Sequence, residues 1–237
     1  MIVENGLVRT MAPQVPTQRA LAIAGERIAG GVGVHETALA SPEVVDLGGR
    51  VVVPGLNDAR VFAGEDFDAV RAALKTAVAR GVTAIHAVDG LRFWAELDAV
   101  GALTIRVWQL LTPEQWGAST KLGLHPGFGS SFLQLGIPEE TQDLSHVYGS
   151  GRLLADLDPL ADLGAAAARG VSLDDALETM TVRPAALAGD ERRRGKLLPG
   201  YAADLVVLDR DPWHDPAVAV VATMVAGRWV HNPPPWP

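Results

Sequence analysis

The chain has 237 residues, of which 48% are hydrophobic and 20% are charged, a composition that excludes a mainly disordered protein. Its net charge of -8 and its dispersed basic residues argue against a nucleic-acid partner. The absence of cysteine excludes disulfides, thiolate catalysis and cysteine-based zinc sites. The sequence has no signal-peptide pattern and no run of about 18 apolar residues, so we predict a cytoplasmic protein without a membrane partner.

The N-terminal region has short apolar runs separated by glycine-rich turns, a pattern typical of strands and turns. After Pro54 the pattern changes, because apolar runs of strand length begin to alternate with segments of helical periodicity. We predict strands over residues 51–56, 82–88 and 103–111, and helices over residues 67–80 and 91–100. Such alternation predicts parallel βαβ units.

The segment from residue 113 to 145 loses this periodicity and is rich in glycine and proline, so we predict mostly loop with one short strand near residues 132–135. Beyond it we predict a strand over residues 145–148 and helices over residues 159–168 and 172–179. Ser172 is the expected N-cap of the second helix, and Arg183-Pro184 is expected to end the helix pair.

The C-terminal tail is β-rich over residues 203–209 and 220–230, with a turn at Ala226-Gly227-Arg228. Both ends of the chain therefore have strand character. We predict that residues 1–53 and 195–237 form one composite β-sandwich domain, with residues 54–194 inserted as an α/β domain.

Four segments carry a resemblance to a known family: ALAIAGERIAGGV, VVDLGGRVVVPGLNDA, GKLLPGYAADLVVLDRDP and TMVAGRWV. They resemble the opening and closing segments of the amidohydrolase superfamily, closest to the amidohydrolase-3 branch of YtcJ-like proteins. The resemblance implies a composite sandwich and a (β/α)8 TIM-type barrel that carries a metal. It also implies an ancestral metal-dependent hydrolase acting on carbon–nitrogen bonds other than peptide bonds.

The sequence departs from this family where the metal should bind. Family members carry His-X-His directly after the PGL-type strand, where this chain has Arg60 and Phe62. A guanidinium and a phenyl ring have no lone pair to give a metal. The Asp that the family carries after Gly-Ser at its last barrel strand is also missing, because the sequence there is Gly149-Ser150-Gly151.

The length of the inserted part also departs from the family. A (β/α)8 barrel takes roughly 250 residues, whereas residues 54–194 give about 140, enough for four or five βα units. We therefore expect a truncated, partial barrel. Its open parallel sheet would leave two edges to cover, which predicts a homo-oligomer or a rearranged barrel.

A few polar residues remain as weak candidates for a catalytic site: Asp58, His86, Asp89 and His146. His86, His146 and Asp58 could form a relocated site of two histidines and one carboxylate that binds zinc or iron. Otherwise we expect no cofactor, a core His86 bonded to a backbone carbonyl, and an Asp58 paired with a base such as Arg60. The remaining histidines are expected in solvated loops or the tail, and Asp204 is expected to be structural: His35, His125, His214, His231.

Three functional hypotheses follow from these observations. The first is an amidohydrolase-like protein that is inactive because its metal ligands are lost. The second is a small-molecule-binding or regulatory pseudoenzyme, which could pair with an active relative. The third is a shortened remnant without a function of its own.

Overall fold

The computed structural model describes residues 1–31, 43–141, 143–215 and 217–236, so His35 lies outside the described residues. The strands are β1 Ile2–Glu4, β2 Leu7–Arg9, β3 Thr17–Gln18, β4 Leu21–Ala24, β5 Arg27–Gly30, β6 Val44–Asp46, β7 Val51–Pro54, β8 Leu56–Phe62, β9 Val82–Ala87, β10 Arg106–Leu111, β11 Leu133–Pro138, β12 Arg152–Leu153, β13 Leu205–Leu208, β14 Val220–Val225 and β15 Arg228–His231. The α-helices are α1 Phe67–Ala79, α2 Leu91–Ala99, α3 Pro113–Lys121, α4 Pro159–Ala168, α5 Leu173–Met180 and α6 Val182–Leu187.

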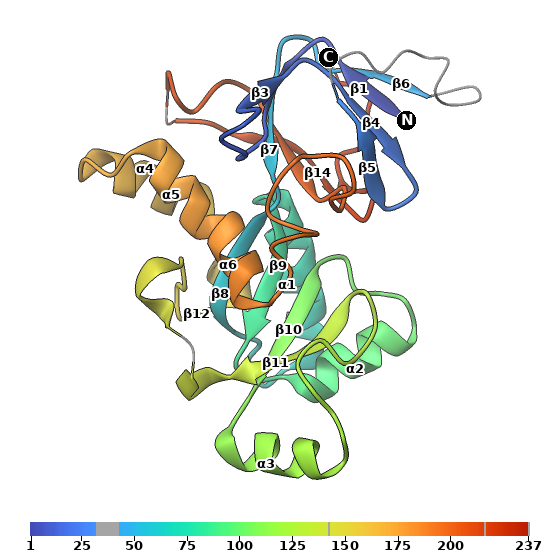
Figure 1. Ribbon diagram of the computed structural model, residues 1–237, viewed down its shortest axis with the longest axis vertical. Helices are drawn as coiled ribbons and strands as arrows, with labels where there is room; N and C mark the ends of the chain where they lie inside the picture. The colour runs from blue at the N-terminus through green and yellow to red at the C-terminus, as the bar shows by residue number, and fades with distance from the viewer. Residues whose placement is uncertain (32–42, 142, 216, 237) are drawn as a thin grey trace.

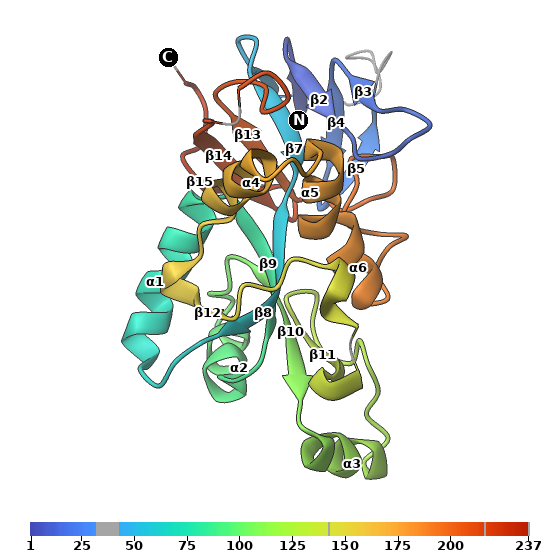
Figure 2. The ribbon, with the colours of Figure 1, turned by 90° about the vertical axis from the view of Figure 1, so that its left-hand side faces the viewer.

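A five-stranded parallel sheet forms the centre of the inserted part, in the order β11-β10-β9-β8-β12 (Figure 1). Helices α1, α2 and α3 each follow one of its strands, which confirms the predicted α/β class. Ile85 and Val107 on the sheet pack in one core with Leu74 of α1 and Trp94 of α2. Helix α6 lies on the other side of the sheet from α1 (Figure 2).

Two mixed sheets form the rest of the molecule, in the orders β5-β4-β1-β6 and β15-β14-β13-β7-β2-β3. The second sheet combines strands from both ends of the chain, since β13 pairs with β7 and places Val206 opposite Val53. Buried residues of both sheets, among them Ile23, Leu205 and Met224, belong to one hydrophobic core. Both termini consequently lie at the same end of the molecule, above the parallel sheet (Figure 1).

The junction between these parts is residue 55. The predicted strand over residues 51–56 is in fact two strands, β7 in a mixed sheet and β8 in the parallel sheet. Gly55 separates them, and a Cβ at this position would lie 2.1 Å from the Thr83 Oγ1 atom. The Gly55 amide donates to the Asp204 carbonyl at 3.0 Å, and the next amide, that of Leu56, donates to Gly81 at 3.1 Å. The chain therefore changes sheets within one residue.

The prediction of loop after residue 113 was partly wrong, because α3 begins there. Thr112 accepts from the Gln115 amide, the Gln115 side chain accepts from the Thr112 amide, and Pro113 occupies the first turn. This capping box and the N-terminal proline stabilise a helix whose apolar periodicity is weak. The predicted short strand is present as β11.

Two other predictions near the C-terminal helices were wrong. Residues 145–148 do not form a strand, because Leu144–His146 is a 3-10 helix and Asp143 caps it through the Ser145 amide. The segment that pairs with β8 is instead β12. Pro184 does not end the helix pair either, since it lies in the first turn of α6, where a missing amide proton costs no hydrogen bond. Ser172 caps α5 as predicted.

The outer edge of β11 is covered by the chain itself. The amides of Gly127 and Ser130 donate to the carbonyls of Leu135 and Leu133 at 2.7 and 2.8 Å, and the Leu135 amide donates to Phe128 at 2.9 Å. The opposite edge strand, β12, has only two residues. Short and covered edges offer few free backbone groups to another chain. In the described part of the chain, no helix has the length and apolar character needed to cross a membrane.

Candidate functional site at the carboxyl end of strand β8

The carboxyl end of β8 presents Arg60 and Phe62, the residues that stand where the resemblance places metal-binding histidines. The Arg60 guanidinium lies over the Phe62 ring, 5.1 Å from its centroid. The Gly149–Gly151 turn runs alongside, and the Gly151 amide donates to the Arg60 carbonyl at 2.9 Å. A Cβ at Gly149 would lie 3.2 Å from Arg60 Cβ, and one at Gly151 would lie 3.3 Å from Arg60 Nη1. The two glycines therefore leave room for the arginine side chain.

Asp58, in the middle of β8, is buried and serves as a link to the same turn. Its Oδ1 atom accepts the backbone amides of Arg60 and Ser150, both at 3.0 Å. Its Oδ2 atom has no hydrogen-bond partner within the described residues, and burial raises the pKa of this carboxyl despite the hydrogen bonds from Ser150 and Arg60. The contact with residue 60 is thus made through the backbone amide, where the sequence had suggested the guanidinium.

His86 lies in the middle of β9 with only 1% of its surface exposed. Its ring packs against Trp108 of β10, with 5.3 Å between the centroids. Neither ring nitrogen has a hydrogen-bond partner of good geometry among the described residues, although the Pro184 carbonyl of α6 faces the ring. Burial lowers the pKa of His86 to about 4, with the Pro184 carbonyl opposing this shift. The imidazole is therefore neutral at pH 7.

The other two candidates lie apart from this core. Asp89, just beyond β9, is half-buried and accepts the Ala63 amide through its carboxylate. His146 is exposed, and its backbone carbonyl accepts Arg183 Nη1 at 3.3 Å. His125 and His214 are exposed as expected, whereas His231 is half-buried in β15.

The residues at this site do not fit a divalent metal. Among the described residues, no group of three His, Asp or Glu side chains lies close enough together to hold one, so Asp58, His86 and His146 are not assembled into a site. The side chains that occupy the expected ligand positions are a cation and a phenyl ring, and neither can donate an electron pair. A guanidinium there also repels a divalent cation.

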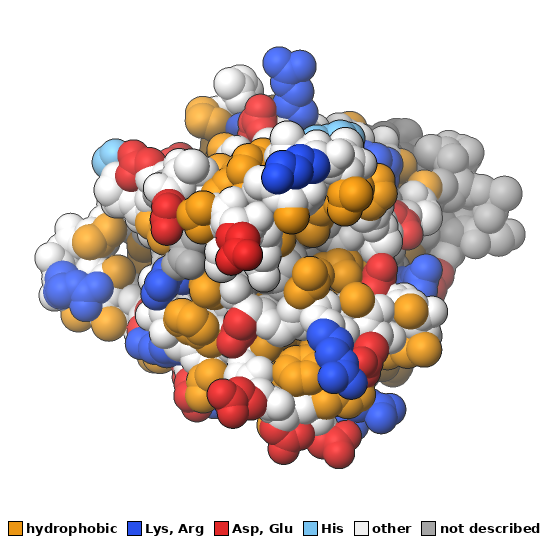
Figure 3. Space-filling model, turned by 90° about the horizontal axis from the view of Figure 1, so that it is seen from below, with side chains coloured by type: hydrophobic (Ala, Val, Ile, Leu, Met, Phe, Trp, Pro, Cys, Tyr) orange, Lys and Arg blue, Asp and Glu red, His pale blue; other side chains and the backbone are white. Residues whose placement is uncertain are grey.

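The surface at this end of the molecule mixes acidic, basic and apolar side chains (Figure 3). This is the end at which β8, β9 and β10 finish and α3 projects (Figure 2). In a parallel α/β sheet the carboxyl ends of the strands are the usual place for a ligand.

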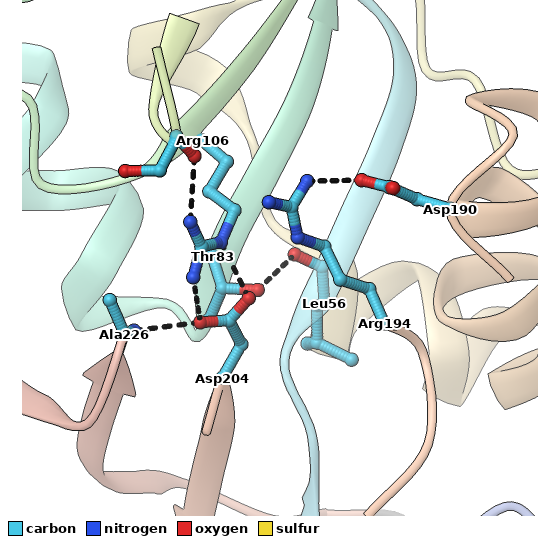
Figure 4. A network of polar contacts seen from close by, with 8 residues as sticks. Leu56, Thr83, Arg106, Asp190, Arg194, Asp204 and Ala226 are labelled. Carbon is cyan, nitrogen blue, oxygen red and sulfur yellow. Dashed lines mark hydrogen bonds and ion pairs between the residues drawn. The ribbon is translucent and has the colours of Figure 1, made fainter. Parts of the chain in front are cut away.

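A buried polar network at the opposite, amino end of the sheet was missed by the sequence analysis. Arg106, the first residue of β10, donates from Nε and Nη2 to the Asp204 carboxylate at 2.7 and 3.0 Å, and from Nη1 to the Ser131 carbonyl at 2.7 Å (Figure 4). Arg194 pairs with Asp190 and lies 5.0 Å from the centroid of Trp108. The detectable signal was an arginine inside the apolar run LTIRVWQLL, since a buried charge requires a partner.

Comparison with known proteins agrees with this architecture. A family model described as "Amidohydrolase family" matches residues 164–231. A comparison with curated proteins finds no significant match. Among solved structures, a putative prolidase from Bifidobacterium longum is 15% identical with a TM-score of 0.73, covering 100% of this chain and 96% of that chain. The A. niger ochratoxinase is 13% identical with a TM-score of 0.72, covering 98% of this chain and 95% of that chain.

The C-terminal part of the chain therefore resembles the amidohydrolase family. The family match covers helices α5 and α6 and strands β13 to β15, which lie in the six-stranded mixed sheet. A Xaa-Pro dipeptidase with bound methionine has the same fold, with 10% identity and a TM-score of 0.70, covering 97% of this chain and 99% of that chain. At these identities the solved structures establish the amidohydrolase-like fold and not a shared activity.

Proposed function

We propose that this amidohydrolase-like chain is a pseudoenzyme that has lost metal-dependent hydrolysis and acts as a small-molecule-binding protein. In this proposal the ancestral reaction was hydrolysis of a carbon–nitrogen bond by a metal-activated water. Such a water requires a metal held by imidazole and carboxylate ligands, which lowers the pKa of the water towards about 7. The ligand positions no longer supply these groups.

The observation that carries this proposal is the stacked pair of Arg60 and Phe62. Both side chains are fixed by packing, since the arginine lies over the ring and beside the Gly149–Gly151 turn. Residue 151, where the resemblance expects a carboxylate, is a glycine with φ +65°, a left-handed conformation that glycine adopts without strain. The turn beside Arg60 therefore supplies no side-chain ligand at this position.

The proposal includes an architecture that agrees with the strand pairing. We propose that the five-stranded sheet is a truncated TIM-type barrel, because its last strand, β12, pairs with its first strand, β8. Such a pairing of last and first strands is what closes a barrel. Residues 1–53 with 195–237 would then be the composite sandwich domain, and residues 54–194 the partial barrel domain.

The first experiment is elemental analysis of the purified protein after dialysis against zinc, manganese or cobalt and then against metal-free buffer. We expect less than about a tenth of an equivalent of any of these metals, because a site without donors binds weakly. Hydrolysis of Xaa-Pro dipeptides and N-acyl amino acids should be no faster with the protein than in buffer. One equivalent of metal together with metal-dependent turnover would refute the proposal.

Three variants show whether any residual turnover comes from this protein or from a contaminant. Asp58→Ala and His86→Ala remove the two buried candidates for a relocated site, and Glu96→Ala removes an exposed carboxylate on α2. If any residual turnover falls in the first two variants and not in the third, the chain has a relocated hydrolase site. If all three match the wild type, the turnover comes from a contaminant.

A further inference from the structure

We infer that the chain binds a small oxyanion, a carboxylate or a phosphate group, in an arginine-lined pocket at the amino end of the parallel sheet. This inference goes beyond the proposed function, because the pocket lies at the other end of the sheet from Arg60 and Phe62. Arg106 begins β10, and the Gly129–Ser131 segment precedes β11. Loss of the metal site therefore leaves this pocket unaffected.

The pocket has a volume of about 260 Å³ and is built from three separate parts of the chain. Strand β5 contributes Arg27, the parallel sheet contributes Arg106 and Gln134, and the loop that follows α6 contributes Arg193 and Arg194. Binding pockets for larger organic ligands usually measure 300 to 1,000 Å³. A space of this size suits a small anion with few non-hydrogen atoms.

Two arginines with little solvent exposure, Arg106 and Arg194, line the pocket together. In Figure 4 the Arg106 guanidinium is turned to the Asp204 carboxylate and the Arg194 guanidinium is turned to Asp190. The two arginine side chains are only 3% and 15% exposed. Burial and the neighbouring Arg106 cation lower the pKa of Arg194 to about 10. Two neighbouring cations that are poorly screened by water repel one another, so an anion that binds beside them lowers the electrostatic free energy of both.

The carboxylates around the pocket do not neutralise it. Asp204 accepts both Arg106 and the Ala226 amide, and Asp190 is shared between Arg193 and Arg194. Around the pocket there are three carboxylates and four guanidinium groups: Asp190, Asp204 and Glu26 against Arg27, Arg106, Arg193 and Arg194. In the contacts described, Arg27 donates only to the Gly200 backbone carbonyl. The surplus is one positive charge, and the exposed Arg27 and Arg193 lie where a ligand would enter.

Guanidinium groups bind carboxylate and phosphate oxygens through paired N–H donors, which gives these oxyanions an advantage over chloride. The Gln134 side chain is half-buried and lies in the same wall, where it can add a neutral donor. The expected ligand is therefore a small organic acid or a phosphate, held by Arg194 from one side and Arg27 from the entrance.

Isothermal titration calorimetry tests this inference with two probes, inorganic phosphate and succinate, each against chloride in low-salt buffer. We expect one of them to bind with a Kd below about 1 mM. Arg194→Gln and Arg27→Gln should weaken that binding by about tenfold or more, because each removes a charge-assisted donor pair. Arg92→Gln makes the same change of charge on exposed α2 and should leave the Kd unchanged.

The outcomes separate the alternatives. Binding of phosphate alone or of succinate alone identifies the ligand group, whereas no binding of either at 10 mM (about ten times the expected Kd) overturns the inference. Equal weakening in all three variants also overturns it, because that result indicates nonspecific charge attraction. Should Arg194→Gln fail to fold, the exposed Arg27→Gln decides the matter on its own. Metal content and turnover do not enter this experiment, so its result is independent of the proposed loss of hydrolysis.

Discussion

Acidification is expected to destabilise this protein through His86. The ring is 1% exposed, and burial lowers its pKa from 6.5 to about 4. Between these two values the unfolded chain binds a proton that the folded chain excludes, so stability falls as the pH falls through this window. Below pH 4 both states are protonated and the loss reaches its maximum, about 3 kcal/mol at 1.36 kcal/mol per pH unit.

The measurement is urea unfolding followed by circular dichroism at pH 7 and pH 4.5, for the wild type and for His86→Leu. Between these pH values His86 alone should cost the wild type about 2 kcal/mol. His86→Leu removes this contribution and retains an apolar group against Trp108, so its unfolding free energy should change less with pH. The raised pKa of the buried Asp58 acts in the opposite direction in both proteins and cancels in the comparison.

His214→Gln is the matched control, because this side chain is 81% exposed. Its unfolding free energy should follow the wild type at both pH values. If His86→Leu loses as much stability as the wild type on acidification, His86 does not carry the pH dependence and the burial argument is wrong.

Three further predictions concern the polar groups around the parallel sheet. Asp204→Ala leaves the buried Arg106 without its carboxylate and should cost about 3–5 kcal/mol in urea unfolding, whereas Arg92→Ala in an exposed pair should cost less than about 0.5 kcal/mol. Asp58→Asn keeps an acceptor for both backbone amides and removes a buried charge, so it should be more stable relative to wild type at pH 7 than at pH 4; the opposite trend would contradict the raised pKa. Gly151→Asp places a carboxylate where the resemblance expects one, at a φ of +65° that aspartate tolerates better than most residues, so it should cost no more than about 1 kcal/mol and should not increase bound zinc; tight zinc binding by this variant would show that the site is still competent.

Periodicity was sufficient to predict the elements that bury one continuous face. Helix α1 and strand β9 were predicted within about one residue, because Val70, Leu74 and Ile85 all point into the same core. Helix α4 matches its prediction at both ends, where Asp158 and Pro159 mark its start.

The missed elements are those stabilised by local hydrogen bonds or by distant partners. Helix α3 depends on the capping box at Thr112, a signal that was present in the sequence and was outweighed by the surrounding glycines. Strand β12 is two residues long and exists only because β8 lies beside it. No local pattern can specify a strand whose hydrogen-bond partner is about 90 residues away.

The candidate site residues also fall into those that the sequence pointed to and those that it did not. The resemblance to the amidohydrolase family singled out residues 60, 62 and 149–151 as the positions where metal ligands were expected, and the structure brings them together at one end of β8. It did not reveal the arginine pocket, because Arg27, Arg106 and Arg194 come from three regions that approach only after the chain ends pair around the sheet. The pairing of β7 with β13 places Asp204 behind Arg106, and the same pairing positions the loop that carries Arg194. The oxyanion pocket that we propose therefore lies at the amino end of the parallel sheet, where strands from both chain ends meet it, and the Arg60–Phe62 pair lies at the opposite, carboxyl end.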